Sequence, residues 1–425
     1  RCCRRQRQMC IRDSFYASCE KIFRPDLKDR PIVILSNNDG CVIARSSEAK
    51  KMGVSMTQPW YQVKDQYLSK GGVVFSSNYE FYADISNRVM NVLSDLCPEI
   101  DIYSIDEAFL DLRSFKKNID LVNFSYDCKR KIREWVGVPV SIGIAPTKTL
   151  AKLANKVAKD DPRFDGVVIL SEPRVIRHFL KSMPVEKIWG IGKRLTARLE
   201  NIGVKSAHDL TQIDSRLIGD NFNVVLERTV RELKGQSCIT LHDFMEPKKQ
   251  IMVSRSFGRS IRSKNLLSEA ISFHASRAAE KLRYEKQKCR LITTFIRSNR
   301  FNTKVKQVYA SRSLELVHPT DDTRIIIKSA NRILEQIFAN GYQYAKAGIL
   351  LSDFTDSYGY QMSLFDKKRD EESASKLMET IDYINLMEIA KVGFGNQGYR
   401  NTWKMKREIK SQRYTTKIDE IPIIK

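Results

Sequence analysis

The chain has 425 residues, of which 29% are charged, and a formal net charge of +23 at pH 7. This length is too great for one hydrophobic core and indicates several domains. The sequence has no stretch of 18 apolar residues, which argues against a membrane-spanning helix. Nine scattered cysteines form no Cys-x-x-Cys pair, so we expect reduced thiols in a cytoplasmic protein and no structural zinc site. The positive charge predicts a polyanionic partner, nucleic acid before membrane, because no basic amphipathic anchor is evident.

The first part of the chain alternates short strands with helices after an atypical start. Residues 1–12 match neither a strand nor an amphipathic helix, and regular patterns begin at Asp13. A β-branched run predicts a buried strand at 31–35, and an Asn-Asn-Asp-Gly sequence predicts a tight turn at 37–40. The patterns beyond this turn predict strands at 41–44 and 73–75 and helices at 46–52 and 79–96.

Two adjacent acids, Asp106 and Glu107, interrupt an apolar stretch. β-Branched and aromatic residues on both sides predict the two strands of a hairpin. Neighbouring side chains of a strand point to opposite faces, so adjacent carboxylates converge only at a turn. Two carboxylates held together repel each other unless a cation neutralises them, and their oxygens suit Mg²⁺, which serves phosphoryl transfer in pairs. The alternative is a solvated turn whose acids have no role.

The alternating order continues after the acids. The apolar spacing predicts a helix at about 118–135, a strand at 138–144, a lysine-containing helix from 146 and a closing strand at 166–170. Strands and helices then alternate with the acids in the middle of the sheet, which is typical of a split βαβ domain with an insertion.

A wholly helical segment is predicted at 173–236. Within it, Gly190 and Gly192 form a tight turn that Lys193 and Arg194 follow directly. This pattern resembles a helix-hairpin-helix, whose backbone N–H groups at a helix start hold a DNA phosphate. The alternative is an ordinary turn between two helices.

The segment after a linker at 240–250 predicts a second α+β domain. Its order is β-α-β-β-α-β, a ferredoxin-like arrangement, with elements at 251–258, 266–284, 289–297, 305–316, 322–339 and 344–354.

Positive charge is concentrated at the start of this domain. Residues 246–306 contain 16 Lys or Arg against four Asp or Glu. We expect Arg255 to contact DNA, and Arg290, Arg297 and Lys306 to line one surface of the sheet against a phosphate backbone. The alternative is a solvated charged face.

The last part of the chain contains a short peptide with apolar anchors, Gln361-Met-Ser-Leu-Phe365. Such exposed peptides dock into pockets of partner proteins. A helix is predicted near 373–389, whereas the motif at 411–416 suggests no mechanism.

With these residues in view, the chain resembles the Y-family, or translesion, DNA polymerases, and most closely the bacterial UmuC type, the catalytic subunit of DNA polymerase V. The resemblance covers about 13–425. It rests on the motifs Phe15-Tyr-Ala-Ser-Cys-Glu20, Leu35-Ser-Asn-Asn-Asp-Gly-Cys-Val-Ile-Ala-Arg45, Ser76-Ser-Asn-Tyr-Glu80, Tyr103-Ser-Ile-Asp-Glu-Ala-Phe109, Thr147-Lys-Thr-Leu-Ala-Lys-Leu-Ala-Asn155 and Ser254-Arg-Ser-Phe-Gly258.

The resemblance implies the architecture of a right-hand polymerase of the α+β class, with a ferredoxin-like palm, small fingers, a helical thumb and a ferredoxin-like little finger. It implies an error-prone polymerase of DNA repair and the SOS response, in the bacterial cytoplasm. The implied ranges are a palm at 13–172 with fingers inserted at about 21–78, a thumb at 173–240, a little finger at 246–356 and a partner-binding tail at 357–425.

The resemblance also implies site roles. Asp106 and Glu107 would bind two Mg²⁺ ions at the junction of primer and incoming deoxynucleoside triphosphate. Tyr16 would be the steric gate that excludes a ribose 2′-hydroxyl, although a plain core aromatic is the alternative. The residues implied to hold the triphosphate are Arg45, Lys50 and Lys159, of which Lys50 is the looser match because many relatives carry Arg there.

Partners follow from the same resemblance. The residues Gln361, Leu364 and Phe365 match the peptide by which such polymerases bind the sliding clamp. The tail falls where UmuC-type proteins contact a UmuD′ subunit and RecA.

One departure concerns the first metal-binding aspartate of the family. The aligned position is Ile11, followed by Arg12, and Asp13 fills only the second acidic place of that motif. We hypothesise that residues 1–12 are foreign to the gene. If Ile11 is authentic, the chain is expected to act as a DNA- and clamp-binding factor with little catalysis. A nucleotide cyclase with the same palm is a weaker alternative, because the helix-hairpin-helix and the basic second domain argue against it.

Overall fold

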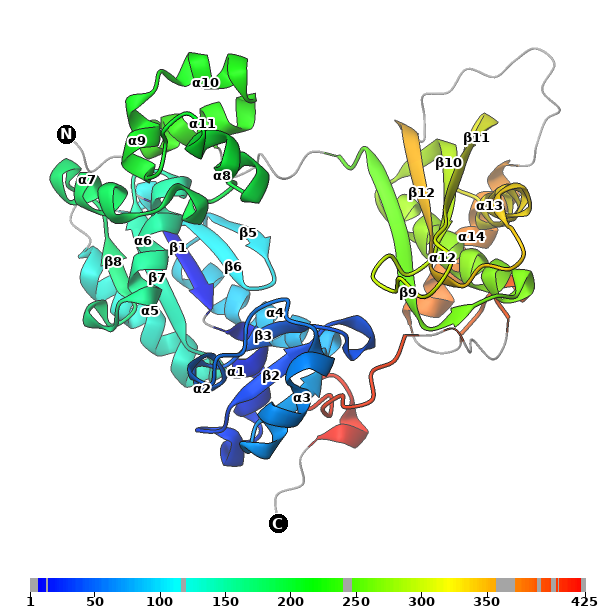
Figure 1. The fold of residues 1–425 in the computed structure, drawn as a ribbon, viewed down its shortest axis with the longest axis horizontal. Helices are drawn as coiled ribbons and strands as arrows, with labels where there is room; N and C mark the ends of the chain where they lie inside the picture. The colour runs from blue at the N-terminus through cyan, green and yellow to red at the C-terminus, as the bar shows by residue number, and fades with distance from the viewer. Residues whose placement is uncertain are drawn as a thin grey trace. The chain divides into compact units, whose positions relative to one another are not determined.

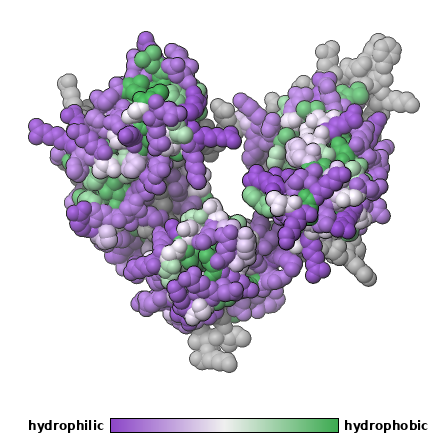
Figure 2. All heavy atoms as spheres, viewed as in Figure 1, coloured by the Kyte–Doolittle hydropathy of each residue, from purple (hydrophilic) through white to green (hydrophobic). Residues whose placement is uncertain are grey.

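The structure is a computed structural model that describes residues 7–12, 14–115, 120–239, 247–356, 371–387, 391–398, 403 and 405–421. The chain forms two compact units. The first consists of Arg1–Ser36, Gly40–Glu246 and Ile409–Lys425, and the second of Asn37–Asp39 and Pro247–Glu408. No helix among the described residues is long and apolar enough to cross a bilayer. The visible surface is mainly hydrophilic with small apolar areas (Figure 2), as the large charge predicts.

The first unit is built on a five-stranded sheet in the order β5-β6-β1-β7-β8. These strands are β5 (Ile100–Ser104), β6 (Glu107–Asp111), β1 (Arg7–Arg12), β7 (Val140–Ala145) and β8 (Val167–Ile169). Strand β1 is central and pairs antiparallel with both β6 and β7 (Figure 1). The prediction that residues 1–12 contain no strand is therefore wrong for 7–12. Hydrogen bonding to two neighbours outweighs the weak strand preference of this basic segment.

The acidic hairpin lies at one edge of this sheet, because β5 is its outermost strand. The expectation that the acids lie in the middle of the sheet is thus correct along the chain but wrong in space. The reason is that β5 pairs with β6 alone, while β6 continues the sheet through β1.

Helices cover both faces of the sheet. Helices α4 (Tyr79–Leu96) and α5 (Leu121–Val136) pack with Ala108 and Leu110 in one core. Helix α6 (Lys148–Asp160) packs with Phe109 in the core of the other face. That second core includes the helices of the predicted thumb, α7 (Pro173–Ser182), α8 (Lys193–Glu200), α9 (Ala207–Gln212), α10 (Ser215–Asn221) and α11 (Val224–Leu233).

A smaller three-stranded sheet lies within the range predicted for the fingers. Its strand order is β3-β2-β4. A helix at Trp60–Ser69, α3, was not predicted from the sequence. The elements are β2 (Ile32–Leu35), β3 (Val42–Arg45), β4 (Val73–Ser76), α1 (Phe15–Ile22), α2 (Ser47–Lys51) and α3 (Trp60–Ser69).

The second unit confirms the predicted β-α-β-β-α-β order. Its strands β9 (Gln250–Ile261), β10 (Gln287–Arg297), β11 (Tyr309–Thr320) and β12 (Tyr344–Asp356) form a sheet in the order β11-β10-β12-β9. Two helices, α12 (Lys264–Tyr284) and α13 (Thr323–Ile337), pack on one face of that sheet (Figure 1). The predicted helix near 373–389 is α14 (Glu371–Leu386).

The end of the chain returns to the first unit. Ile409 N donates to Ser76 Oγ at 3.1 Å. The Tyr414 ring is buried and stacks on Phe23, with ring centroids 4.9 Å apart. The motif at 411–416 is thus part of the fold of the first unit.

Candidate active site

The acidic pair lies at the turn of the β5–β6 hairpin. Ser104 faces Glu107 across the hairpin, so Asp106 belongs to the turn itself. Ser104 Oγ donates to Asp106 Oδ1 at 2.7 Å, which fixes the carboxylate. Both acids line one pocket of about 710 Å³. The turn therefore converges two adjacent carboxylates on one space, as the sequence predicts.

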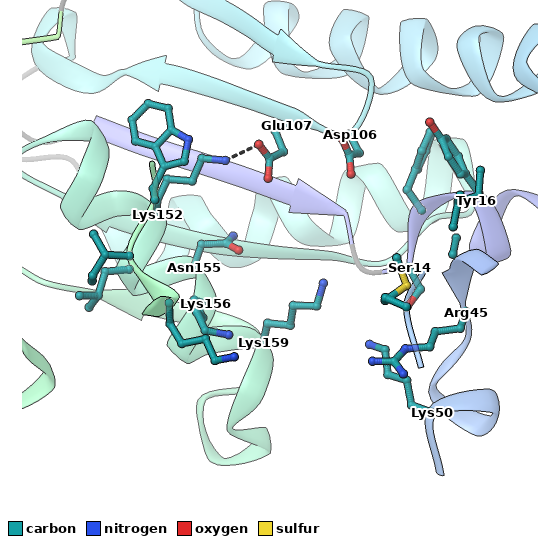
Figure 3. A pocket seen from close by; sticks show the side chains of 18 of the residues that line it. Ser14, Tyr16, Arg45, Lys50, Asp106, Glu107, Lys152, Asn155, Lys156 and Lys159 are labelled. Carbon is teal, nitrogen blue, oxygen red and sulfur yellow. Dashed lines mark hydrogen bonds and ion pairs between the residues drawn. The ribbon is translucent and has the colours of Figure 1, made fainter. Parts of the chain in front are cut away.

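The same pocket collects all the residues predicted to bind nucleotide. Tyr16 comes from α1, Arg45 from β3, Lys50 from α2 and Lys159 from α6. Figure 3 shows the two carboxylates on one side of the pocket and Arg45, Lys50, Lys156 and Lys159 across from them. Anionic and cationic walls thus face each other across a space of nucleotide size.

Helix α6 supplies more of the cationic wall than predicted. Lys152, Lys156 and Lys159 recur at intervals of four and three residues, so they share one side of the helix. The Thr147 side chain caps the helix by accepting from Leu150 N. Lys152, Lys156 and Lys187 were not named as site residues, although the helical spacing of the first two was a usable signal.

Lys152 forms an ion pair with Glu107 inside the pocket (Figure 3). Its ammonium also lies 4.9 Å from the centroid of the Tyr103 ring and 5.4 Å from that of Trp189. Burial lowers the pKa of Lys152, while the Glu107 carboxylate opposes that shift. A protein cation therefore contacts one of the two acids.

The Tyr16 ring is held against other aromatic rings. It stacks on Tyr82, with centroids 4.6 Å apart and planes inclined by 17°, and meets Tyr79 edge-on at 6.0 Å. Burial, with Tyr79 and Asp106 nearby, raises the pKa of Tyr16 to about 12. The hydroxyl is therefore neutral at physiological pH.

Ile11, which stands where the family has its first metal-binding aspartate, lies beside the acids in the sheet. The strand register places Ile11 opposite Glu107 on one side and Ser141 on the other. Asp13 lies outside the described residues. Within the described part of the chain, no group of three or more His, Cys, Asp or Glu could hold a metal ion. The donors Asp106 and Glu107 fit a hard divalent cation, but an isoleucine side chain adds no ligand.

The predicted helix-hairpin-helix turn has the expected local geometry. Gly190 has a φ of 86°, which favours glycine, and Gly192 is the N-cap residue of α8. Lys193 and Arg194 are exposed in the first turn of that helix.

The predicted DNA-binding arginines of the second unit do not all share a face. Buried Ile292 and Ile296 alternate toward the helices, so Arg297 points to the opposite, partly exposed face. A bulge between Cys289 and Leu291 shifts the register, and Arg290 contacts Glu315 at 2.8 Å.

Glu315 alternates with Leu314 and Leu316, which pack on the core, so it also lies on the partly exposed face. Arg290 therefore reaches the face that carries Arg297. Arg255, in contrast, pairs in register with buried Ala347 and belongs to the helix-covered side. Lys306 lies outside the strands and stacks 4.8 Å over the Tyr342 ring.

Lys346 was missed by sequence reasoning. It pairs in register with Arg297. Burial lowers the pKa of Lys346, and Arg297 and Arg255 lower it further. The predicted clamp peptide at 361–365 lies outside the described residues.

Family models match most of the chain. Residues 11–156 match the impB/mucB/samB family, 248–364 its C-terminal domain, 174–204 the IMS family HHH motif, and 375–424 a domain of unknown function, DUF4113. The chain is 47% identical to Protein ImpB of Salmonella typhimurium over 415 residues, 97% of each chain. It is 44% identical to Protein UmuC of the same species over 423 residues, 98% of this chain and 99% of the relative.

The chain belongs to the UmuC type of the Y-family DNA polymerases. Its fold is similar to that of a solved Y-family DNA polymerase chimera, Dbh-Dpo4(243-245)-Dbh, with a TM-score of 0.63 and 20% identity over 83% of this chain and 99% of that one. The function of this Y-family polymerase is error-prone, template-directed DNA synthesis past damaged bases. Membership in the family also implies the use of a divalent metal.

Proposed function

We propose that Asp106 and Glu107 hold the metal site of nucleotidyl transfer and that Mg²⁺ is the metal. The observation that supports this most directly is the single pocket in which both carboxylates face a wall of Lys and Arg. When bound, Mg²⁺ would acidify the primer 3′-hydroxyl and neutralise charge that develops on the transferred phosphate. By family resemblance, Asp106 and Glu107 would hold two such ions.

The residues across the pocket bind the incoming triphosphate. Arg45, Lys50 and Lys159 supply fixed cations for its oxygens, and Lys156 adds to the same wall. Because these residues come from three separate helices and strands, the bound triphosphate bridges the predicted fingers and palm.

Tyr16 selects the sugar. Its ring lines the pocket near Asp106 and is backed by Tyr82. A ring held in this way leaves room for a deoxyribose and collides with a 2′-hydroxyl.

DNA is bound by two further surfaces. Lys193 and Arg194, with the N–H groups at the start of α8, contact a backbone phosphate. Arg297, Arg290 and Lys346 contact phosphates on the partly exposed face of the second unit. Two cations paired in register, as Arg297 and Lys346 are, repel each other until an anion neutralises them.

Protein partners are proposed from sequence and family alone. Gln361, Leu364 and Phe365 bind the sliding clamp, and the tail contacts a UmuD′-like subunit and RecA. Pull-down of the clamp by the full chain, compared with a Leu364→Ala/Phe365→Ala variant, tests the first of these.

A second candidate function follows from Ile11. If the chain lacks a third metal ligand, it acts as a DNA- and clamp-binding factor whose catalysis is impaired. Primer extension by the full chain and by Ile11→Asp separates the two functions. A gain of incorporation in Ile11→Asp identifies a polymerase with a damaged site, and strong Mg²⁺-dependent extension by the unsubstituted chain contradicts the impaired-factor function.

A further inference from the structure

The motif at 411–416 contacts a fully buried part of the first unit. The buried Asn78 Nδ2 lies within hydrogen-bond distance of three acceptors of the tail, namely Ser411 O at 3.1 Å, Ser411 Oγ at 2.9 Å and Gln412 O at 3.1 Å. Asn78 precedes the first residue of α4. The tail is therefore fixed at the start of the helix that carries Tyr82.

Ser411 also reaches a buried acid. Its Oγ donates to Glu20 Oε1 at 2.9 Å. The Tyr82 hydroxyl donates to the same oxygen at 2.5 Å. Glu20 and Tyr82 have no exposed surface, so few other donors can replace the Ser411 hydroxyl if it is removed. One carboxylate oxygen thus joins the tail to Tyr82.

Tyr82 in turn determines where the Tyr16 ring can lie. The two rings stack at 4.6 Å, and Tyr16 and Glu20 both belong to α1. A continuous line of contacts runs from Ser411 through Glu20 and Tyr82 to the ring at the edge of the pocket.

Aromatic packing fixes the tail beyond this point. The buried Tyr414 ring stacks on Phe23 at 4.9 Å and meets Phe81 edge-on at 5.4 Å. Phe81 and Tyr82 are adjacent on α4. Two independent contacts, one polar and one aromatic, therefore hold the tail behind the stacked pair of tyrosines.

We propose that the C-terminal motif around Ser411 is a positioning element for Tyr16, acting through Glu20 and Tyr82, and so contributes to sugar discrimination. This inference rests on the proposed role of Tyr16 as the sugar-selecting residue. Ser411, Glu20 and Tyr82 are not among the residues that line the pocket. They restrict the ring, and a ring that can tilt discriminates less against a 2′-hydroxyl.

The test compares the dissociation constants of dATP and ATP for the full chain on primer–template DNA, a readout that needs no turnover. We expect Tyr16→Ala to abolish most of the discrimination. Ser411→Ala and Tyr82→Phe, which each remove one hydroxyl, should reduce the ATP-to-dATP ratio of dissociation constants about three- to tenfold. Ser411→Thr keeps the hydroxyl and should retain the ratio.

Thr416→Ala is the matched control, because Thr416 is exposed on the same tail. It should leave both constants unchanged. If Tyr16→Ala lowers the ratio but Ser411→Ala and Tyr82→Phe do not, the tail does not position the ring and the inference is wrong. If Tyr16→Ala itself leaves the ratio unchanged, the proposed role of Tyr16 fails instead. Should Ser411→Ala not fold, the Tyr82→Phe and Ser411→Thr pair decides the outcome.

Discussion

Lys152 is paired with Glu107 at the acidic turn, so that a protein cation lies against a carboxylate proposed to bind metal. The ammonium is nearly buried between the rings of Tyr103 and Trp189. Screening by solvent is weak in such a place, and the pair is stronger than an exposed one. Lys152 and a divalent cation therefore compete for Glu107.

Removing this competition should strengthen metal binding. Lys152→Met keeps most of the length of the side chain and removes its charge. We expect the dissociation constant for Mn²⁺, followed by electron paramagnetic resonance, to fall about three- to tenfold, which is about 1 kcal/mol.

The matched control for this experiment is Lys156→Met. Lys156 lies one turn further along α6 and pairs with the exposed Asp160 at 2.7 Å. The Lys156→Met variant should have a dissociation constant for Mn²⁺ within about twofold of that of the unsubstituted chain. Weaker Mn²⁺ binding in Lys152→Met would show that Lys152 supports the metal site rather than competing with it.

The acidic hairpin was predictable because its signal is local. A turn between two apolar strands must bring Asp106 and Glu107 together, and the structure does so. The β-α-β-β-α-β pattern at 251–354 is likewise local, and the second unit follows its predicted order. Family motifs then supplied Tyr16, Arg45 and Lys159, which spacing alone does not connect.

Other features depend on contacts between distant segments. Strand β1 is basic and forms because β6 and β7 pair with it on both sides. Lys346 lies in an apolar strand. Its position opposite a second cation follows only from the strand register, which pairs it with Arg297. The position of the tail motif depends on its contacts with Asn78 and Glu20, which lie more than 300 residues earlier in the chain. No local pattern contains this information.

The buried Glu20 predicts an unusual dependence of stability on pH. Burial raises the pKa of Glu20 from 4.5 to about 7, although hydrogen bonds from Tyr82 and Ser411 oppose the rise. Between these values the folded protein keeps a proton that the unfolded chain has released. The contribution of Glu20 to the free energy of unfolding therefore falls as pH rises from about 4.5 to about 7.

Glu20→Gln removes this penalty because it is neutral at every pH. Relative to the unsubstituted chain, the variant should gain stability between pH 5 and pH 8, by at most about 3 kcal/mol. Urea unfolding at the two pH values measures the gain. Glu134→Gln, at an exposed position of α5, should show no such change. An equal effect of Glu20→Gln at both pH values would mean that Glu20 is not protonated on folding.

The two neighbouring cations Arg297 and Lys346 predict that removing Arg297 weakens DNA binding in a salt-dependent way. Arg297→Ala should weaken binding of primer–template DNA about tenfold at low salt and reduce the slope of log K against log salt by about one. The control is Arg277→Ala, which removes the same charge from an exposed position on α12. A slope that Arg297→Ala leaves unchanged would exclude a phosphate contact at this position.

The central claim is that Asp106 and Glu107 form the site of nucleotidyl transfer. Single-nucleotide primer extension tests it most directly, with the unsubstituted chain, Ile11→Asp and Ile11→Asp/Asp106→Asn. We predict that Ile11→Asp extends the primer with Mg²⁺ and that adding Asp106→Asn lowers this rate at least about 100-fold. The rate of the unsubstituted chain separates the polymerase from the impaired factor and does not bear on the role of the two acids. Extension by the double variant at the rate of Ile11→Asp would contradict the claim.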